Sequence, residues 1–213
     1  MFDTIRSAFS ERLFGRSPGR AKIVDLDALK TALSQESAHV AQSATYNYLR
    51  ARTGFLGPKL FNETAFLEAV EVTRWEAYGA VLADLVMIAE GAARPFLPPG
   101  GAAAEWRNLF HQALAVYPPP SHREDGWLGL EEAFAARLAA AAALPPAAPE
   151  QIAVAAGQSI FSQLPLHPDI RKPDEEMVIN TVRFRMLRSW ESLKERLEWP
   201  RIAAEIRHLP AAE

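Results

Sequence analysis

Residues 77–89 read AYGAVLADLVMIA and form the most apolar run of this 213-residue chain. The run is too short to cross about 30 Å of hydrocarbon and Asp84 interrupts it, so we expect a helix of a globular protein rather than a membrane span. The helical pattern extends from after Asn62 to about Glu90, and Gly91 is expected to end it.

Helical periodicity also dominates on both sides of this segment, and strand signals are nearly absent. Upstream, Asp25 or Asp27 can act as the N-cap of a long helix that runs to the stop at Arg52-Thr53-Gly54. Downstream, further helices are predicted at about 102–117, 127–143, 149–164, 173–197 and 200–208. The sequence therefore predicts an all-α, irregular bundle of about seven to eight helices with no sheet.

The chain divides into two parts of unequal size. Residues 1–22 combine a short amphipathic helix at 2–14 with a basic tether that contains Gly15, Pro18 and Gly19. Residues 23–213 are expected to form a single helical domain, because 213 residues suit one domain of ordinary size. Within that domain, the proline- and glycine-rich segment 94–101 is expected to break the helical pattern.

Composition excludes several classes of function. The chain has no cysteine, which removes disulfide frameworks, thiol catalysis and cysteine-based metal sites. The net charge of −3 argues against nucleic-acid binding. Phosphate-binding glycine loops are absent, and Gly157-Gln158-Ser159-Ile160-Phe161 lacks the last glycine of a nucleophile elbow. Because these motifs are missing, we expect no cofactor and no bound metal. We expect a cytoplasmic location, since no secretory signal is visible.

The predicted N-terminal helix carries large apolar side chains on one face, and arginines lie elsewhere on it or just beyond it. The apolar residues are Phe2, Ile5, Phe9 and Leu13, and the arginines are Arg6, Arg12 and Arg16. Residues 1–22 hold five basic and two acidic residues, a local excess of three positive charges. This pattern is typical of an interfacial membrane helix or a docking peptide. The alternative is a terminal helix that packs on the body of the protein.

Asp84 is the main candidate for a buried functional group. A carboxylate in this apolar segment loses hydration, so its pKa is expected to rise unless a cation pairs with it. Arg74 and Tyr78 lie one turn apart on the same helix and are candidates to extend a polar network. The structural alternative is a buried ion pair with Arg183 or Arg185 from another helix.

Glu36 and His39 form an E-x-x-H pair on the helix that follows Asp25. Two such pairs on facing helices bind metals in di-iron bundles, together with further glutamates. The second pair is missing here, because Glu71 is followed at the same offset by Arg74. A metal at Glu36 and His39 therefore stays an alternative to the favoured prediction of no metal.

Two further features have a favoured and an alternative interpretation. The polar loops at 121–126 and 167–172 each contain a histidine and charges of both signs, and we interpret them as ordinary solvated loops. The predicted helix at 173–197 carries a broad apolar stripe, with Met177 and Phe184 on its other side. We expect this helix to be central. The alternative is an outer helix that presents a patch, with Arg183, Arg185 and Arg188 beside Phe184.

Three classes of function follow from these observations. The favoured one is a non-catalytic helical adaptor or assembly factor that binds a protein partner, with the N-terminal helix as a contact to a membrane surface. The second is an enzyme built around Asp84, Arg74 and Tyr78, or around a metal at Glu36 and His39. The third is a helical bundle that binds a small molecule between its helices.

Overall fold

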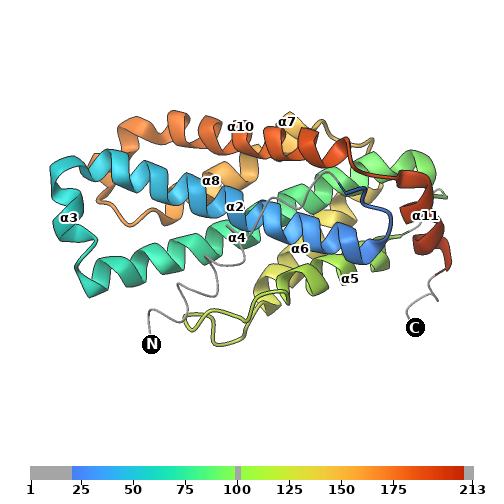
Figure 1. Ribbon diagram of the computed structural model, residues 1–213, viewed down its shortest axis with the longest axis horizontal. Coiled ribbons are helices and arrows are strands. Elements are labelled where there is room, and N and C mark those ends of the chain that lie inside the picture. The colour runs from blue at the N-terminus through green and yellow to red at the C-terminus, as the bar shows by residue number, and fades with distance from the viewer. Residues whose placement is uncertain (1–20, 99–101, 209–213) are drawn as a thin grey trace.

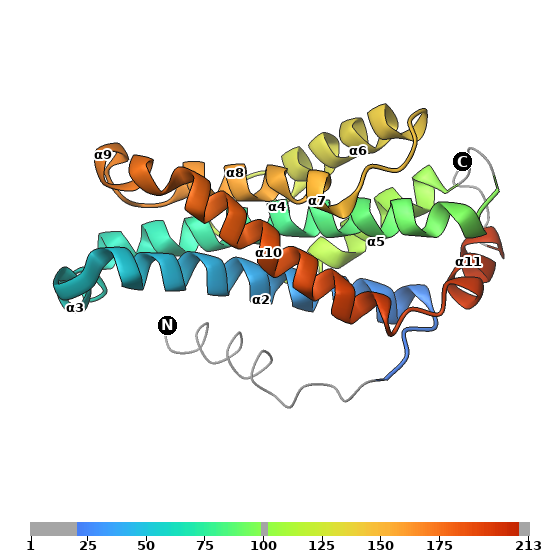
Figure 2. The same ribbon diagram turned by 90° about the horizontal axis from the view of Figure 1, so that it is seen from above.

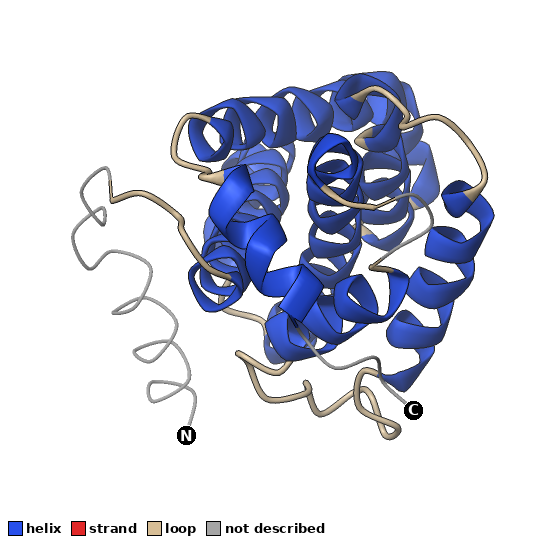
Figure 3. Ribbon diagram, turned by 90° about the vertical axis from the view of Figure 1, so that its right-hand side faces the viewer, coloured by secondary structure: helices blue, strands red, loops and turns tan. Residues whose placement is uncertain are grey.

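The computed structural model describes residues 21–98 and 102–208. Over these residues the chain forms seven helices of ten or more residues and no strand, apart from one parallel bridge between Ile23 and Leu197 (Figures 1 and 3). The predicted all-α bundle is confirmed. The helix predicted at 2–14 lies outside the described residues.

Two long helices form a hairpin at the start of the described chain, and the remaining helices pack around it (Figures 1 and 2). The hairpin consists of α2 (Leu26–Thr53) and α4 (Thr64–Ala93), joined by η1 (Gly54–Leu56) and α3 (Gly57–Leu60). After η2 (Arg94–Phe96) the chain continues through α5 (Ala103–Leu114), α6 (Leu128–Ala142), α7 (Pro149–Ile152), α8 (Val154–Gln163), α9 (Pro168–Arg171), η3 (Lys172–Asp174), α10 (Glu175–Lys194) and α11 (Trp199–His208).

Local signals explain the ends of α2. The Asp25 side chain accepts a hydrogen bond from the amide of Ala28 at 2.8 Å, so the N-cap prediction is confirmed. At the other end Gly54 adopts a φ of +48°, which glycine tolerates better than other residues. The predicted span of this helix is therefore confirmed at both ends.

Helix α4 is the centre of the bundle and packs against α2, α5, α6, α7, α8 and α10. It passes through Gly91 and ends at Ala93, so the predicted stop at Gly91 is wrong. Gly91 instead allows a close approach, because a Cβ there would lie 3.3 Å from the Cβ of Pro146. Pro95, which has no amide hydrogen, follows the end of the helix.

Helix α10 lies on the outside of the bundle, across α2 and α8 (Figure 2). Val182, Met186 and Leu193 are buried on its inner side. On its outer side, however, Met177 is 55% exposed and Phe184 is 63% exposed. The expectation of a central helix is therefore wrong, because the bundle covers only one of the two apolar faces.

One predicted helix is divided in the structure, and the described helices fall short of the requirements of a membrane span. The predicted helix at 149–164 is interrupted at Ala153, which separates α7 from α8. In residues 21–98 and 102–208, none of the helices combines the length and the apolar character that a bilayer crossing requires.

Gly157 sets the distance between α8 and α10. A Cβ at this position would lie 3.0 Å from both the Cα and the carbonyl oxygen of Ile179, and backbone atoms cannot move aside easily. We expect Gly157→Ala to lower the free energy of unfolding by about 1–3 kcal/mol through overpacking. Denaturant unfolding measures this change.

Gly129→Ala is the matched control, because a Cβ at Gly129 meets nothing within 4 Å. Gly129 lies in the first turn of α6, so the same substitution is expected to be neutral or to stabilise by up to about 1 kcal/mol. Equal losses of stability in the two variants would contradict the close packing of α8 on α10.

Candidate functional site

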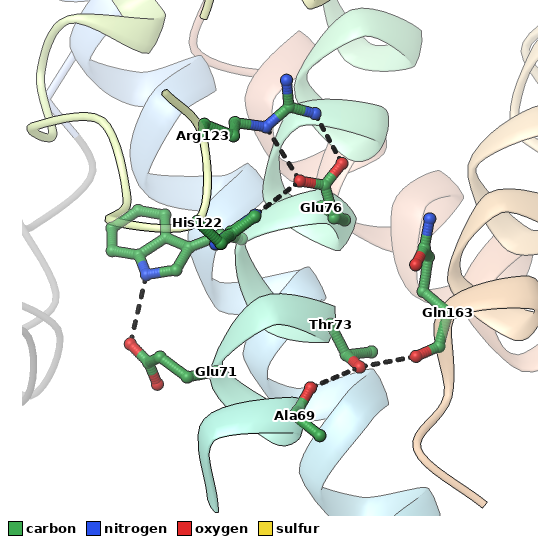
Figure 4. Close-up of polar contacts among 8 residues, drawn as sticks. Ala69, Glu71, Thr73, Glu76, His122, Arg123 and Gln163 are labelled. Atoms are coloured by element: carbon green, nitrogen blue, oxygen red, sulfur yellow. Dashed lines mark hydrogen bonds and ion pairs between the residues drawn. The ribbon is translucent and has the colours of Figure 1, made fainter. Parts of the chain in front are cut away.

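A polar cluster joins the middle of α4 to the loop between α5 and α6 (Figure 4). His122 Nε2 lies 2.8 Å from Glu76 Oε1, and Arg123 donates to both carboxylate oxygens of Glu76, at 2.8 Å from Nε and 2.5 Å from Nη2. Residues 121, 122, 124 and 125 are exposed, as the prediction of a solvated loop implies, but His122 and Arg123 also tie this loop to α4. Sequence spacing gave no sign of the pairing, since Glu76 lies more than forty residues away.

The surroundings of Glu76 keep its carboxylate ionised. Burial raises the pKa of Glu76, but the hydrogen bonds from Arg123 and His122 outweigh this effect and hold the pKa below its usual value. Within the described part of the chain, neither Glu76 nor His122 has a serine or threonine hydroxyl as a hydrogen-bond partner. The cluster therefore anchors the loop after α5 to the middle of α4.

An aromatic cluster lies beside this ion pair and fills the space between α4, α5 and the following loop. The Trp75 and Tyr78 rings contact each other and also those of Tyr117 and Trp127, with centroids 5.4 to 6.2 Å apart, and all four side chains are buried. The Arg123 guanidinium lies 5.5 Å from the centroid of the Trp127 ring, so it contacts both the carboxylate and an aromatic face.

Tyr78 and Arg74, which the sequence placed near Asp84, have other partners. The Tyr78 hydroxyl donates to the carbonyl of Ala113 at 2.7 Å and lies 2.9 Å from the Ser34 hydroxyl, and burial raises its pKa. Arg74 pairs with Glu71 one turn earlier on α4. The structure does not join these residues to Asp84, because offsets of six and ten residues put them on different sides of the helix.

Asp84 has no exposed surface and is held by two other helices. It forms a short ion pair with Arg137 of α6, and it accepts a hydrogen bond at 2.8 Å from the amide of Ala156 in the first turn of α8. The expected partners Arg183 and Arg185 are wrong. Arg185 donates to the Ser43 hydroxyl, and the Arg183 guanidinium lies 5.5 Å from the Phe184 ring centroid.

Burial has the largest effect on the pKa of Asp84. It raises the pKa to about 6, although the Arg137 guanidinium and the Ala156 amide favour the ionised form. The Asp84 carboxylate also satisfies an amide that α8 leaves without a partner in its own first turn. This arrangement supports the structural interpretation of Asp84 rather than a carboxylate that faces a substrate cleft.

The ion pair predicts that replacing Arg137 lowers the free energy of unfolding more than replacing Asp84 does. Arg137→Met leaves a buried carboxylate and should cost about 3–5 kcal/mol of unfolding free energy at pH 8. Because protonation relieves that charge, the loss should shrink as the pH falls toward 5. Asp84→Asn leaves an arginine whose side chain is already 34% exposed, so it should cost less, about 1–3 kcal/mol.

The raised pKa of Asp84 sets the direction of the pH dependence. The folded state binds the proton more tightly than the unfolded state, so this group lowers stability as the pH rises from about 4 to about 6. Asp84→Asn should remove that part of the pH profile in denaturant unfolding. If Arg137→Met lowered the free energy of unfolding by the same amount at pH 5 and at pH 8, that result would contradict a buried, poorly solvated Asp84.

Glu76 should show the opposite pH dependence. Its pKa is lowered, so its contribution to stability is present above the usual pKa of 4.5 and disappears as the pH falls through the lower folded value. Glu76→Gln should cost about 1.5–3 kcal/mol at pH 7, with the difference from the unmodified protein shrinking below pH 4.5. Urea unfolding across this range measures it, with the exposed Glu68→Gln as control. A pH-independent difference would contradict the charged pairing.

The metal alternative receives no support from the geometry. His39 is exposed on α2, and Glu36 is only partly buried. In residues 21–98 and 102–208, no three or more histidine, cysteine or acidic side chains gather in a way that could hold a metal ion.

An open groove of about 400 Å³ runs between α5 and α6. Phe110 and Phe134 stack against each other in its lining, 4.1 Å apart, and His111 Nδ1 lies 2.9 Å from Glu131 Oε1. Charged side chains of both signs line the groove, whereas small-molecule sites are mostly apolar and enclosed. Sequence reasoning missed the groove, because His111 and Glu131 lie on different helices.

The two most exposed large apolar side chains of the described residues lie at the end of the bundle where α3 joins α2 to α4 (Figures 1 and 2). Phe55 is fully exposed and Leu56 is 65% exposed, both on η1. Ile170 of α9 is also exposed, and Arg52 of α2 donates to its carbonyl oxygen at 2.8 Å from Nη2. We call Phe55, Leu56, Leu67 and Ile170 the bundle tip.

Sequence reasoning also missed the bundle tip. Phe55 and Leu56 stand between Gly54 and Gly57-Pro58, where apolar residues break the usual polar composition of a turn. That signal was available in the sequence. It did not distinguish a covered turn from an exposed one.

The chain matches no known family model, no curated protein and no solved structure. Its fold and side-chain geometry define an all-α bundle whose interior carboxylates are used in structural pairs. Its two most exposed large apolar side chains in the described residues, Phe55 and Leu56, lie on the turn at one end of the bundle.

Proposed function

We propose that this protein is a non-catalytic helical adaptor that binds a protein partner through the bundle tip. The observation that carries the proposal is the exposure of Phe55 and Leu56 side by side on one turn, at the extremity of the molecule. Contiguous exposed apolar groups of this kind mark interaction sites in folded proteins.

Backbone hydrogen bonds close the turn that presents these side chains. The amide of Gly57 donates to the carbonyl of Gly54, and the amide of Phe61 donates to the carbonyl of Gly57 at 2.9 Å. A Cβ on Gly57 would lie 3.0 Å from the Thr53 hydroxyl oxygen, so glycine lets the turn pack on the end of α2. A contact surface that is already ordered loses less entropy when a partner binds.

Charges around the bundle tip favour a protein over a membrane as the partner. Arg50, Arg52 and Lys59 are exposed in this part of the chain, and so are Glu63 and Glu68. Segments that bind anionic membranes carry a cluster of basic residues without acidic ones among them, whereas an apolar centre with a rim of both signs is the usual composition of a protein interface.

Replacing Phe55 and Leu56 with serine together tests this surface. Both side chains are exposed, so the free energy of unfolding should change by no more than about 0.5 kcal/mol. Affinity capture from native extract, followed by mass spectrometry, should show a partner bound to the unmodified chain and lost from the double variant. Leu144→Ser is the matched control, because Leu144 is 61% exposed in the loop that follows α6.

The control variant Leu144→Ser should still capture the partner that the unmodified chain captures. Retention of the partner by the double variant would contradict the assignment of the surface, and so would its loss from the control as well. Binding of lipid vesicles that depends on Phe55 and Leu56 would reassign the bundle tip to a membrane.

A further inference from the structure

An exposed stripe with two large apolar side chains lies on the outer side of α10. Met177 is 55% exposed and Phe184 is 63% exposed. The exposed residues Thr181 and Arg188 continue the spacing of four and three residues that lines up side chains along a helix. In Figure 1 α10 runs along the upper edge of the molecule, and in Figure 2 it crosses the front of the bundle. We call Met177, Thr181, Phe184 and Arg188 the α10 face.

The charged residues of α10 that form no ion pair are separated along the helix by sign. In the described part of the chain these are Glu175 and Glu176 in the first turn, followed by Arg183, Arg185 and Arg188. The three arginines flank Phe184 in the sequence, and the Arg183 guanidinium lies 5.5 Å from the centroid of its ring. Charge therefore favours an occupant that carries an acidic group next to an apolar one, and it opposes a basic occupant.

We propose that the α10 face is the contact surface of a weak homodimer, in which the α10 helices of two chains pack antiparallel about a two-fold axis. A second copy of the chain has the required composition, because Glu176 lies beside Met177 whereas Arg188 follows Phe184 by one turn. An interface around a two-fold axis joins a surface to itself, so that surface has to be self-complementary. The proposal is independent of the bundle tip and of the partner proposed there.

The positions of the charges decide the direction and the register of the two helices. A parallel pair would place Arg188 against Arg188 and Glu176 against Glu176, and like charges opposite each other are unfavourable. In an antiparallel pair with the axis close to Thr181, Glu176 of each chain comes level with Arg188 of the other. Phe184 then lies between Met177 and Thr181 of the other chain, as a side chain of one helix fits between residues of its neighbour.

The association is expected to be weak, because the shared surface is short. From Met177 to Arg188 the helix rises by about 17 Å. Interfaces well below the standard size of about 1,600 Å² are typical of transient complexes. We therefore expect a dissociation constant of about 10–100 µM, which corresponds to a dimer that forms and separates with concentration.

Sedimentation equilibrium of the full-length chain at increasing concentration tests whether the dimer forms through the α10 face. Phe184→Asp should weaken association by at least about tenfold, since it places a charge in the apolar centre of the contact. It should leave the thermal unfolding temperature unchanged, because Phe184 is exposed. Phe55→Asp is the matched control: Phe55 is fully exposed on the bundle tip, so its replacement should not affect the dimer.

Exchanging two charges tests the antiparallel arrangement. Arg188→Glu alone and Glu176→Arg alone should each raise the dissociation constant about tenfold, because two-fold symmetry repeats each substitution at both ends of the contact. The variant with both substitutions restores opposite charges, so its dissociation constant should return to within about threefold of the unmodified value.

Four results would overturn the proposal. The first is a chain that stays monomeric up to about 500 µM. The second is a dimer that Phe184→Asp leaves intact, and the third is a dimer that Phe55→Asp dissociates, which would assign the contact to the bundle tip. The fourth is a variant with both charge substitutions that associates no better than either single variant.

Discussion

The Asp84 carboxylate holds three helices at one buried point of the bundle. It belongs to α4, pairs with Arg137 of α6 and accepts a hydrogen bond from the Ala156 amide at the start of α8. An unpaired charge in this apolar segment would be strongly destabilising, so the positions of α6 and α8 on α4 depend on the pair. Its pKa of about 6 indicates that the two partners offset only part of the cost of burial.

The same use of polar groups for structure recurs along α4. Glu76 fixes the loop after α5 through His122 and Arg123, and Tyr78 bonds to the backbone of α5. Asp84, Glu76 and Tyr78 are each hydrogen-bonded to other groups of the protein. Exposed apolar side chains lie elsewhere, among them Phe55 and Leu56 at the bundle tip and Met177 and Phe184 on α10. Exposed apolar groups that lie together mark interaction sites in folded proteins, which is the support for the proposed binding function.

The sequence predicted the features that depend on local signals. Asp25 and Gly54 mark the ends of α2, and the apolar neighbours of Asp84 indicated its burial. The partner of Asp84 depends on how α6 packs, and the alanine-rich sequence of that helix has little periodicity to reveal its inner side. The outer position of α10 was also hidden, because a helix with two apolar faces does not show which of them the fold will cover.

An NMR titration of the Asp84 side-chain carboxyl carbon tests most directly whether this residue is the buried node that joins α4, α6 and α8. The structure predicts a pKa of about 6, well above the usual value of 3.8, with a chemical shift change that also reaches the Ala156 amide. A pKa at or below 3.8, with no response at Ala156, would mean that the carboxylate faces solvent or is fully compensated, and would contradict this account of the fold.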